Sequence, residues 1–152
     1  MSAAKVLVFG FGNPGRGDDG LGPLFASEIE KLGLAGIACQ TDMQLQVEHI
    51  VDMQGRDMVL FIDADVSCEA PFEFGELESE KDSSYTSHAM TPQAIMHSYS
   101  SVLKERPPRT FLLRIRGERF DLGDELSSSA LRHMEASRIF VLQFLREMNI
   151  GC

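Results

Sequence analysis

Two short, almost uninterrupted apolar runs constrain the fold of this chain more than any other feature of its sequence. They cover Lys5 to Phe11 and Met58 to Ala64. Strands that are apolar on both faces are typical of parallel sheets, because helices cover both sides of such sheets. Each run leads into glycine or acidic residues. We therefore interpret the two runs as central strands of a parallel sheet in an α/β fold.

Two further segments show the alternation of strands that are buried on one face. They are Ile37 to Thr41 and Thr110 to Arg116, and in the second every other residue is a large apolar one. Alternation of this kind indicates a face that is less completely covered. We therefore place both strands toward the periphery of the sheet. Phe72 to Phe74 is a candidate for an additional short strand.

Helical spacing of apolar residues links these strands. It covers about Leu21 to Leu32, Leu45 to Met53, a segment that begins at Thr91-Pro92, and Glu125 to Met148. Strands that alternate with helices in this order predict right-handed crossovers and helices on both faces of the sheet. The expected fold is a three-layer α/β/α sandwich around a mostly parallel, twisted sheet. Residues 1–152 are expected to form a single domain, since the sequence shows no repeat and no linker.

The net charge and the cysteines limit the partners and the compartment. The charge is −9 at pH 7, so the summed field repels phosphate backbones and anionic membranes. No stretch reaches the roughly 20 apolar residues that span a bilayer, and we expect no signal peptide. Three cysteines without a paired spacing fit neither a disulfide framework nor a thiolate metal site. We expect a cytoplasmic protein that binds neither nucleic acid nor membranes.

The segment from Cys68 to Met90 departs from the alternation of strands and helices. It is long, acidic and poor in aliphatic residues. Long loops inside compact domains are often functional lids or binding loops. The alternative interpretation is a solvated run of charges over Glu76 to Asp82.

A glycine-rich loop follows the first predicted strand. Gly10, Gly12 and Gly15 match the GxGxxG pattern of dinucleotide-binding folds, and Asp42 is a candidate ribose ligand. In a dinucleotide-binding fold, however, the helix begins inside the glycine pattern, whereas Pro23 predicts a later start here. A nucleotide-binding, Rossmann-like module is therefore a less favoured alternative.

Acidic residues follow both central strands. Asp18 and Asp19 lie in the loop after the first strand, and Asp63 directly follows the apolar part of the second. We expect one of the paired aspartates to cap the next helix, which leaves the other free. Open α/β sheets bind their ligands at the carboxyl ends of the strands. If the two strands are neighbours, Asp19 and Asp63 therefore converge on one crevice, where a buried carboxylate needs a partner or a metal.

His88 differs from the other three histidines because it lies in a predicted loop. It belongs to Ser87–Pro92, just before a predicted helix, whereas the others lie within helices and are expected to have surface or packing roles. Functional residues gather in loops that a rigid scaffold holds. Two carboxylates and an imidazole form a mixed oxygen and nitrogen set that suits a divalent transition metal. Asp19, Asp63 and His88 are therefore the candidate site.

These motifs together resemble the hydrogenase maturation proteases, the family that trims the C-terminal extension from the large subunit of nickel-iron hydrogenases. The likeness covers nearly the whole chain. Its ordered matches are Gly10 to Gly22, Ile62-Asp63-Ala64 and Ser87-His88. The resemblance implies that Asp19, Asp63 and His88 contact the metal and act in catalysis. Asp18 is the register alternative to its neighbour.

The resemblance also implies the activity, the partner and the cofactor. It implies an endopeptidase whose substrate is a protein, the nickel-loaded precursor of a hydrogenase large subunit. The substrate carries the nickel, and no organic cofactor is expected. Many members have a glycine-rich loop where this chain has Thr41 to Gln46, a departure that concerns substrate recognition. The alternative is a non-catalytic nickel-sensing or docking protein in hydrogenase assembly, since no nucleophile motif is present.

Overall fold

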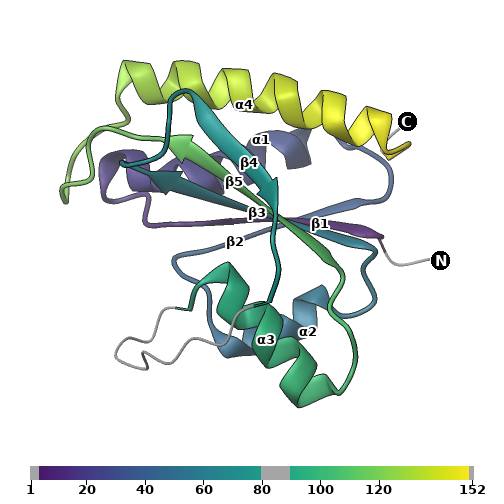
Figure 1. The fold of residues 1–152 in the computed structure, drawn as a ribbon. Helices are drawn as coiled ribbons and strands as arrows, with labels where there is room; N and C mark the ends of the chain where they lie inside the picture. Colours follow the sequence, from purple (N-terminus) through teal and green to yellow (C-terminus); the bar gives the residue numbers. More distant parts are fainter. Residues whose placement is uncertain (1–3, 80–89, 151–152) are drawn as a thin grey trace.

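A single twisted sheet organises the protein, of which the computed structural model describes residues 4–79 and 90–150. Its strands are β1 (Val6–Phe11), β2 (Ile37–Asp42), β3 (Met58–Asp65), β4 (Phe72–Glu76) and β5 (Arg109–Arg116). They lie in the order β2-β1-β3-β5-β4, and all neighbours are parallel except β4, which is antiparallel to β5 (Figure 1). The expected, mostly parallel α/β sheet is confirmed.

Helices cover both faces of this sheet. They are α1 (Leu21–Lys31), α2 (Ile50–Met53), α3 (Pro92–Leu103) and α4 (Ser128–Glu147), with short 3-10 turns η1 (Gly17–Gly20) and η2 (Val47–His49). Figure 1 shows α1 and α4 on one side of the sheet and α2 and α3 on the other. The three-layer arrangement is therefore confirmed. Within the described residues, no helix combines the length and the apolar character needed to cross a membrane.

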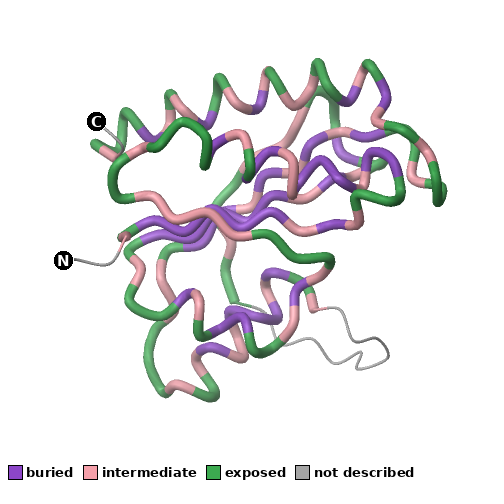
Figure 2. The backbone as a smooth tube through the Cα atoms, turned by 180° about the vertical axis from the view of Figure 1, so that it is seen from behind, coloured by how far each residue is buried: buried purple, intermediate pink, exposed green. Residues whose placement is uncertain are grey.

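The two apolar runs form the middle of the sheet because both of their faces are buried. On β3, Leu60 and Ile62 point into the core under α1 and α4, while Val59 and Phe61 point into the core against α2 and α3. All four are 0% exposed, and Figure 2 shows the buried colour continuing along these strands. Full burial of such a side chain contributes roughly 1.5–3 kcal/mol relative to exposure.

The predicted position of the strand at Thr110 to Arg116 was wrong. This strand, β5, is not peripheral, because the short strand β4 pairs with it and occupies the edge. Its alternation has another cause: Phe111, Leu113 and Ile115 lie in the core under α4, whereas the opposite face is covered only in part. The predicted short strand at 72–74 and the peripheral position of β2 are confirmed.

The boundaries of the later helices follow from their caps. Thr91 Oγ1 accepts a hydrogen bond from the amide of Ala94 and starts α3, as the sequence predicts. Ser127 Oγ accepts from the amide of Ala130, so α4 begins three residues later than expected. The buried stripe of α3 follows Ile95 and Tyr99, whereas Val102 is 59% exposed.

Candidate functional site

The loop that carries the paired aspartates folds back over the end of β1. Pairing of Gly10 with Ile62 places this loop beside the end of β3. A Cβ atom on Gly10 would lie 1.9 Å from the carbonyl oxygen of Gly22, and one on Gly12 would lie 1.9 Å from that of Asp19. Only glycine permits such close approach of two backbones. These glycines are thus required for packing of the loop and of α1 against the strand.

Asp19 is partly buried in the 3-10 turn η1, with its carboxylate held by the same loop. Its Oδ2 atom accepts a hydrogen bond of 2.8 Å from the amide of Asn13. Among the described residues, no group donates a hydrogen bond to its Oδ1 atom. Within residues 4–79 and 90–150, the amide of Asn13 is thus the donor that orients this carboxylate at the carboxyl edge of the sheet.

Asp63 lies at the end of β3 and has an unusual ionisation. Burial raises its pKa to about 7, and repulsion from the charges of Asp19 and Asp65 adds to this effect. The amide of Ala64, which donates a hydrogen bond of 2.8 Å to Oδ1, and the charge of Arg114 act in the opposite direction. The charge of Asp19 therefore acts on Asp63 at the neighbouring ends of β1 and β3. A bound cation would remove the cost of burying the two charges together.

The next carboxylate on β3, Asp65, has the opposite character. Its Oδ2 atom accepts a hydrogen bond of 3.0 Å from Arg114, and its Oδ1 atom accepts two from Ser67. Burial alone would raise the pKa of Asp65, but the hydrogen bonds from Ser67 and the contact with Arg114 outweigh burial and lower it. Arg114 is also bound by Glu73. Both carboxylate oxygens of Asp65 thus have partners. Among the described residues, Asp63 accepts a hydrogen bond at Oδ1 alone.

Asp18 is not a register alternative to Asp19, because hydrogen bonds to the loop before α4 occupy both oxygens of its carboxylate. It is 0% exposed and accepts hydrogen bonds of 2.7 to 3.0 Å from the amides of Glu118, Arg119 and Ser127 and from the Ser127 hydroxyl. Burial acts to raise the pKa of Asp18, but these four bonds lower it below the usual value. Asp18 therefore ties η1 to the loop before α4.

The expected capping of α1 by one of the paired aspartates was wrong. The N-cap of this helix is Gly20, and no side chain accepts a hydrogen bond from its first turn. The reason is that η1 precedes α1 directly and turns Asp18 toward the loop before α4 and Asp19 toward Asn13. Both carboxylates thus point away from the helix that follows them.

The third predicted ligand, His88, lies outside the described residues. Among residues 4–79 and 90–150, no three metal-binding side chains of histidine, cysteine, aspartate or glutamate gather in one place. The described chain resumes at Met90, whose amide donates a hydrogen bond of 3.1 Å to the carbonyl oxygen of Leu45. Asp19 and Asp63 are therefore the part of the candidate site that the described structure contains.

A buried histidine for which the sequence predicts a surface or packing role lies in η2, beside the end of β2. His49 is 6% exposed; its Nδ1 atom accepts from the amide of Gln46, and its Nε2 atom lies 3.0 Å from Asp42 Oδ2. Asp42 is therefore engaged and not free as a ribose ligand. The start of α1 at Leu21, well beyond the glycine pattern, also disagrees with a dinucleotide-binding fold.

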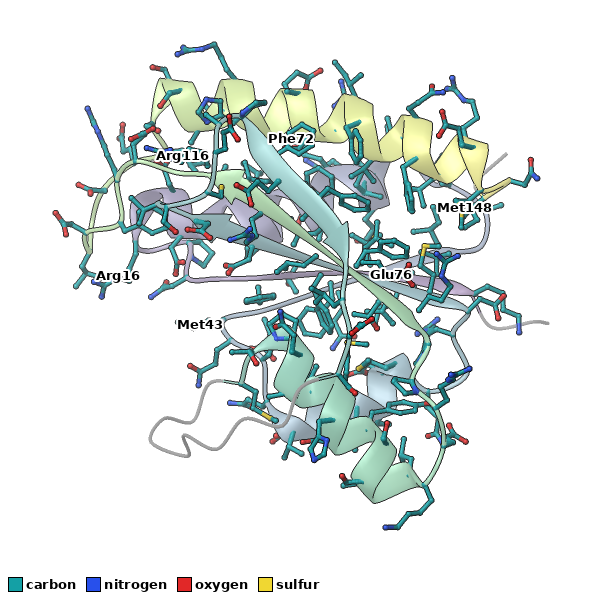
Figure 3. The ribbon with its side chains drawn as sticks, in the orientation of Figure 1. Arg16, Met43, Phe72, Glu76, Arg116 and Met148 are labelled. Carbon is teal, nitrogen blue, oxygen red and sulfur yellow. The ribbon has the colours of Figure 1, made fainter. Side chains whose placement is uncertain are left out.

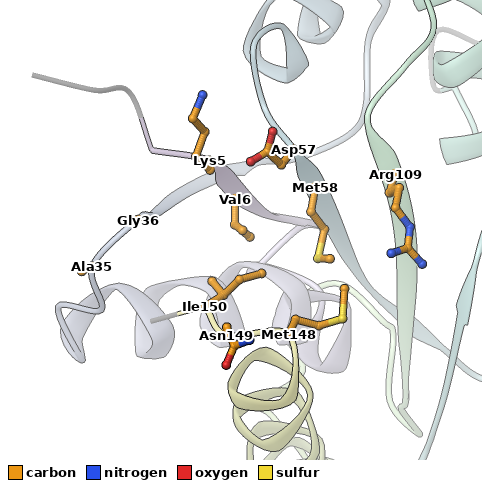
Figure 4. Close-up of a pocket in the computed structure, with 10 residues that line it drawn as sticks. All are labelled: Lys5, Val6, Ala35, Gly36, Asp57, Met58, Arg109, Met148, Asn149 and Ile150. Atoms are coloured by element: carbon orange, nitrogen blue, oxygen red, sulfur yellow. The ribbon is translucent and has the colours of Figure 1, made fainter. Parts of the chain in front are cut away.

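Two cavities lie at different places relative to Asp63. One of 490 Å³ opens at the amino ends of the strands, beside Val6, Met58 and Arg109, at the opposite end of the sheet (Figure 4). The other, of 350 Å³, lies between β4, β5 and the first turn of α3. Figure 3 shows Arg16 and Met43 on the side where β1, β3 and β5 end, and Met148 on the other side. Of these two cavities, the second lies on the face of the sheet that carries Asp63.

The fold is the one seen in hydrogenase maturation endopeptidases. The structure of the hydrogenase maturating endopeptidase HybD from E. coli matches with a TM-score of 0.75 and 21% identity over 97% of this chain and 95% of that one. The [NiFe] hydrogenase maturation protease HycI from Thermococcus kodakarensis matches with a TM-score of 0.71 and 18% identity, covering 96% and 95%.

A hydrogenase 2 maturation peptidase from a Thaumarchaeota archaeon matches with a TM-score of 0.68 and 21% identity, covering 93% of this chain and 97% of that one. No protein-family model and no curated protein matches the sequence. The likeness is thus one of three-dimensional structure along nearly the whole chain, and it defines the fold.

Proposed function

We propose that this protein is an endopeptidase that removes the C-terminal extension of a nickel-iron hydrogenase large-subunit precursor after nickel insertion. The observation that carries the proposal is the pair of carboxylates, Asp19 and Asp63, at the carboxyl edge of a sheet with the fold of hydrogenase maturation endopeptidases. The precursor is the protein partner. The processing would take place in the cytoplasm.

The proposed recognition of nickel rests on the electrostatics of this pair. Asp63 holds a proton near neutral pH because burial and the charge of Asp19 disfavour its ionisation. A divalent cation presented by the precursor would displace this proton and bind both carboxylates. We assign His88 as the third ligand, which completes an oxygen and nitrogen set suited to nickel. The nickel belongs to the substrate and marks a precursor that is ready for cutting.

The surrounding residues have positioning roles in this proposal. Asp18 holds η1 in place through its hydrogen bond from the amide of Ser127, and the amide of Asn13 orients the carboxylate of Asp19. A metal held at this point can polarise the scissile carbonyl or activate a water for attack on it.

The proposed function predicts nickel-dependent cutting of the precursor. Purified protein is incubated with a nickel-loaded large-subunit precursor and, separately, with the nickel-free form, and the intact masses are measured. We expect loss of a C-terminal fragment from the loaded precursor only. Equal cutting of both forms would show that nickel is not the signal. Binding of both without any loss of mass would replace the protease with the docking-protein alternative.

A further inference from the structure

A groove leads along the sheet from the candidate site. Its volume is 350 Å³, and its lining includes Glu73, Gly75, Leu77, Gln93, Leu112 and Arg114. Leu112 packs in the same core as Val59 and Phe61, so the groove opens on the face of the sheet that also carries Asp63. In the pairing of β3 with β5, Arg114 lies directly opposite Asp63. One end of the groove therefore borders the candidate site.

β4 forms one wall of the groove, and within the part of the chain that the structure describes no strand pairs with its outer edge. β4 is the last strand of the sheet, and its backbone meets β5 through Pro71, which accepts from the amide of Arg116, and Leu77, which donates to Thr110. Backbone groups in a strand point alternately to its two sides. The amides and carbonyls of Phe72, Phe74 and Glu76 therefore face outward. Such an edge is a template for an added strand.

The floor of the groove is open and of mixed polarity. Gly75 is exposed, and a Cβ atom built on it would meet no heavy atom within 4 Å. Leu77 and Leu112 are half-buried and offer apolar surface, while Gln93 contributes an amide from the first turn of α3. A space of this kind suits the side chains of an extended polypeptide. The main chain of that polypeptide would pair with the outer edge of β4.

The charges around the groove favour a basic occupant. Three carboxylates, those of Asp65, Glu73 and Glu76, form ion pairs with two guanidinium groups, those of Arg109 and Arg114. The groove is thus left with excess negative charge, and the whole chain carries −9. A segment with a lysine or arginine is attracted to this surface, whereas an acidic segment is repelled.

We propose that an extended, net basic segment of the precursor binds in this groove, with its main chain along the outer edge of β4 and its side chains over Gly75. The segment then leads directly to Asp63. This inference rests on the proposed function, since it takes the precursor as the partner. It assigns β4 and the groove as a binding surface that is separate from the nickel ligands.

The test fills the groove without touching the site. Gly75→Tyr adds a large side chain at a strand position whose backbone conformation any residue adopts, so the fold should be retained. Gly75→Ala is the conservative variant, and Arg132→Tyr places the same tyrosine side chain on the exposed surface of α4, across the sheet. Binding of the nickel-loaded precursor is measured by calorimetry, cutting by intact mass, and folding by thermal unfolding.

We expect Gly75→Tyr to weaken binding of the precursor at least tenfold, while the rate of cutting at saturation and the unfolding midpoint stay as in the unmodified protein. Gly75→Ala and Arg132→Tyr should bind within about twofold of it. Unchanged binding by folded Gly75→Tyr overturns the inference. If the unmodified protein binds the precursor without cutting it, the proposed protease activity fails, while weaker binding by Gly75→Tyr still supports the groove.

Discussion

Replacement of Asp63 with asparagine is expected to abolish processing of the precursor and, at the same time, to stabilise the free protein above pH 7. Processing is lost because an amide does not supply the charge that binds the cation of the substrate. Stability is gained because the pKa of Asp63 is raised to about 7 by burial and by repulsion from Asp19. Asparagine keeps the hydrogen bond from Ala64 and carries no charge to bury.

The sign of this effect depends on pH. The folded protein holds the proton of Asp63 up to about pH 7, whereas an unfolded aspartate loses it near the usual pKa of 3.8. Wild-type stability therefore falls between about pH 4 and pH 7 through this group, and the penalty persists above. The gain from Asp63→Asn should be near zero at pH 4 and about 1–3 kcal/mol at pH 8.

Chemical unfolding at pH 4 and pH 8, together with the intact-mass assay, measures both effects. Asp65→Asn is the matched control on the same strand. Ser67 and Arg114 lower the pKa of Asp65 in the folded protein, so the substitution of Asp65 should decrease the free energy of unfolding. Normal processing by Asp63→Asn would remove this residue from the mechanism. Equal stability changes in the two variants would contradict the assigned ionisation.

Replacement of Asp18 with asparagine is expected to destabilise the fold by about 2–4 kcal/mol, since several buried donors lose their acceptor or face an amide donor. These donors are the amides of Glu118, Arg119 and Ser127 and the hydroxyl of Ser127. The lowered pKa of Asp18 means that its stabilisation is present above pH 4 and is lost as the pH falls through the folded value.

Unfolding midpoints in denaturant measure this loss. Asp121→Asn is the matched control, because Asp121 is an exposed aspartate in the loop that Asp18 holds. We expect a change within about 0.5 kcal/mol for the control. If Asp18→Asn is no less stable than the control, the four hydrogen bonds do not anchor η1, and the orientation of Asp19 must have another cause.

The sequence predicted that Asp19 and Asp63 converge on condition that the two apolar runs are neighbouring strands, and the structure pairs β1 with β3. Both are buried on two faces, so they occupy the middle of the sheet, and their ends lie side by side. The GxGxxG match, in contrast, has two physical explanations. Glycine at 10 and 12 is required by close approach of the backbone, and the same pattern would serve a pyrophosphate.

The distinction between the paired aspartates could not be predicted from the sequence. Both precede a helix, and the donors that hold Asp18 lie 100 to 109 residues further along the chain. No local pattern reports such contacts. The pairing of Asp42 with His49 was missed for a similar reason, since it depends on how the turn η2 packs against Phe9. Whether β5 lies at the edge of the sheet depends on whether β4 pairs with it. Because β4 does so, β4 occupies the edge and β5 lies inside the sheet.

X-ray absorption at the nickel edge tests the central claim most directly. The nickel-loaded precursor, altered at the cleavage site so that it is not cut, is measured alone and in complex with the protein. We predict that oxygen and nitrogen ligands join the nickel on complex formation. These new ligands should be reduced in Asp63→Asn and should lack imidazole in His88→Ala. An unchanged nickel spectrum in a verified complex would contradict recognition of the metal by Asp19, Asp63 and His88.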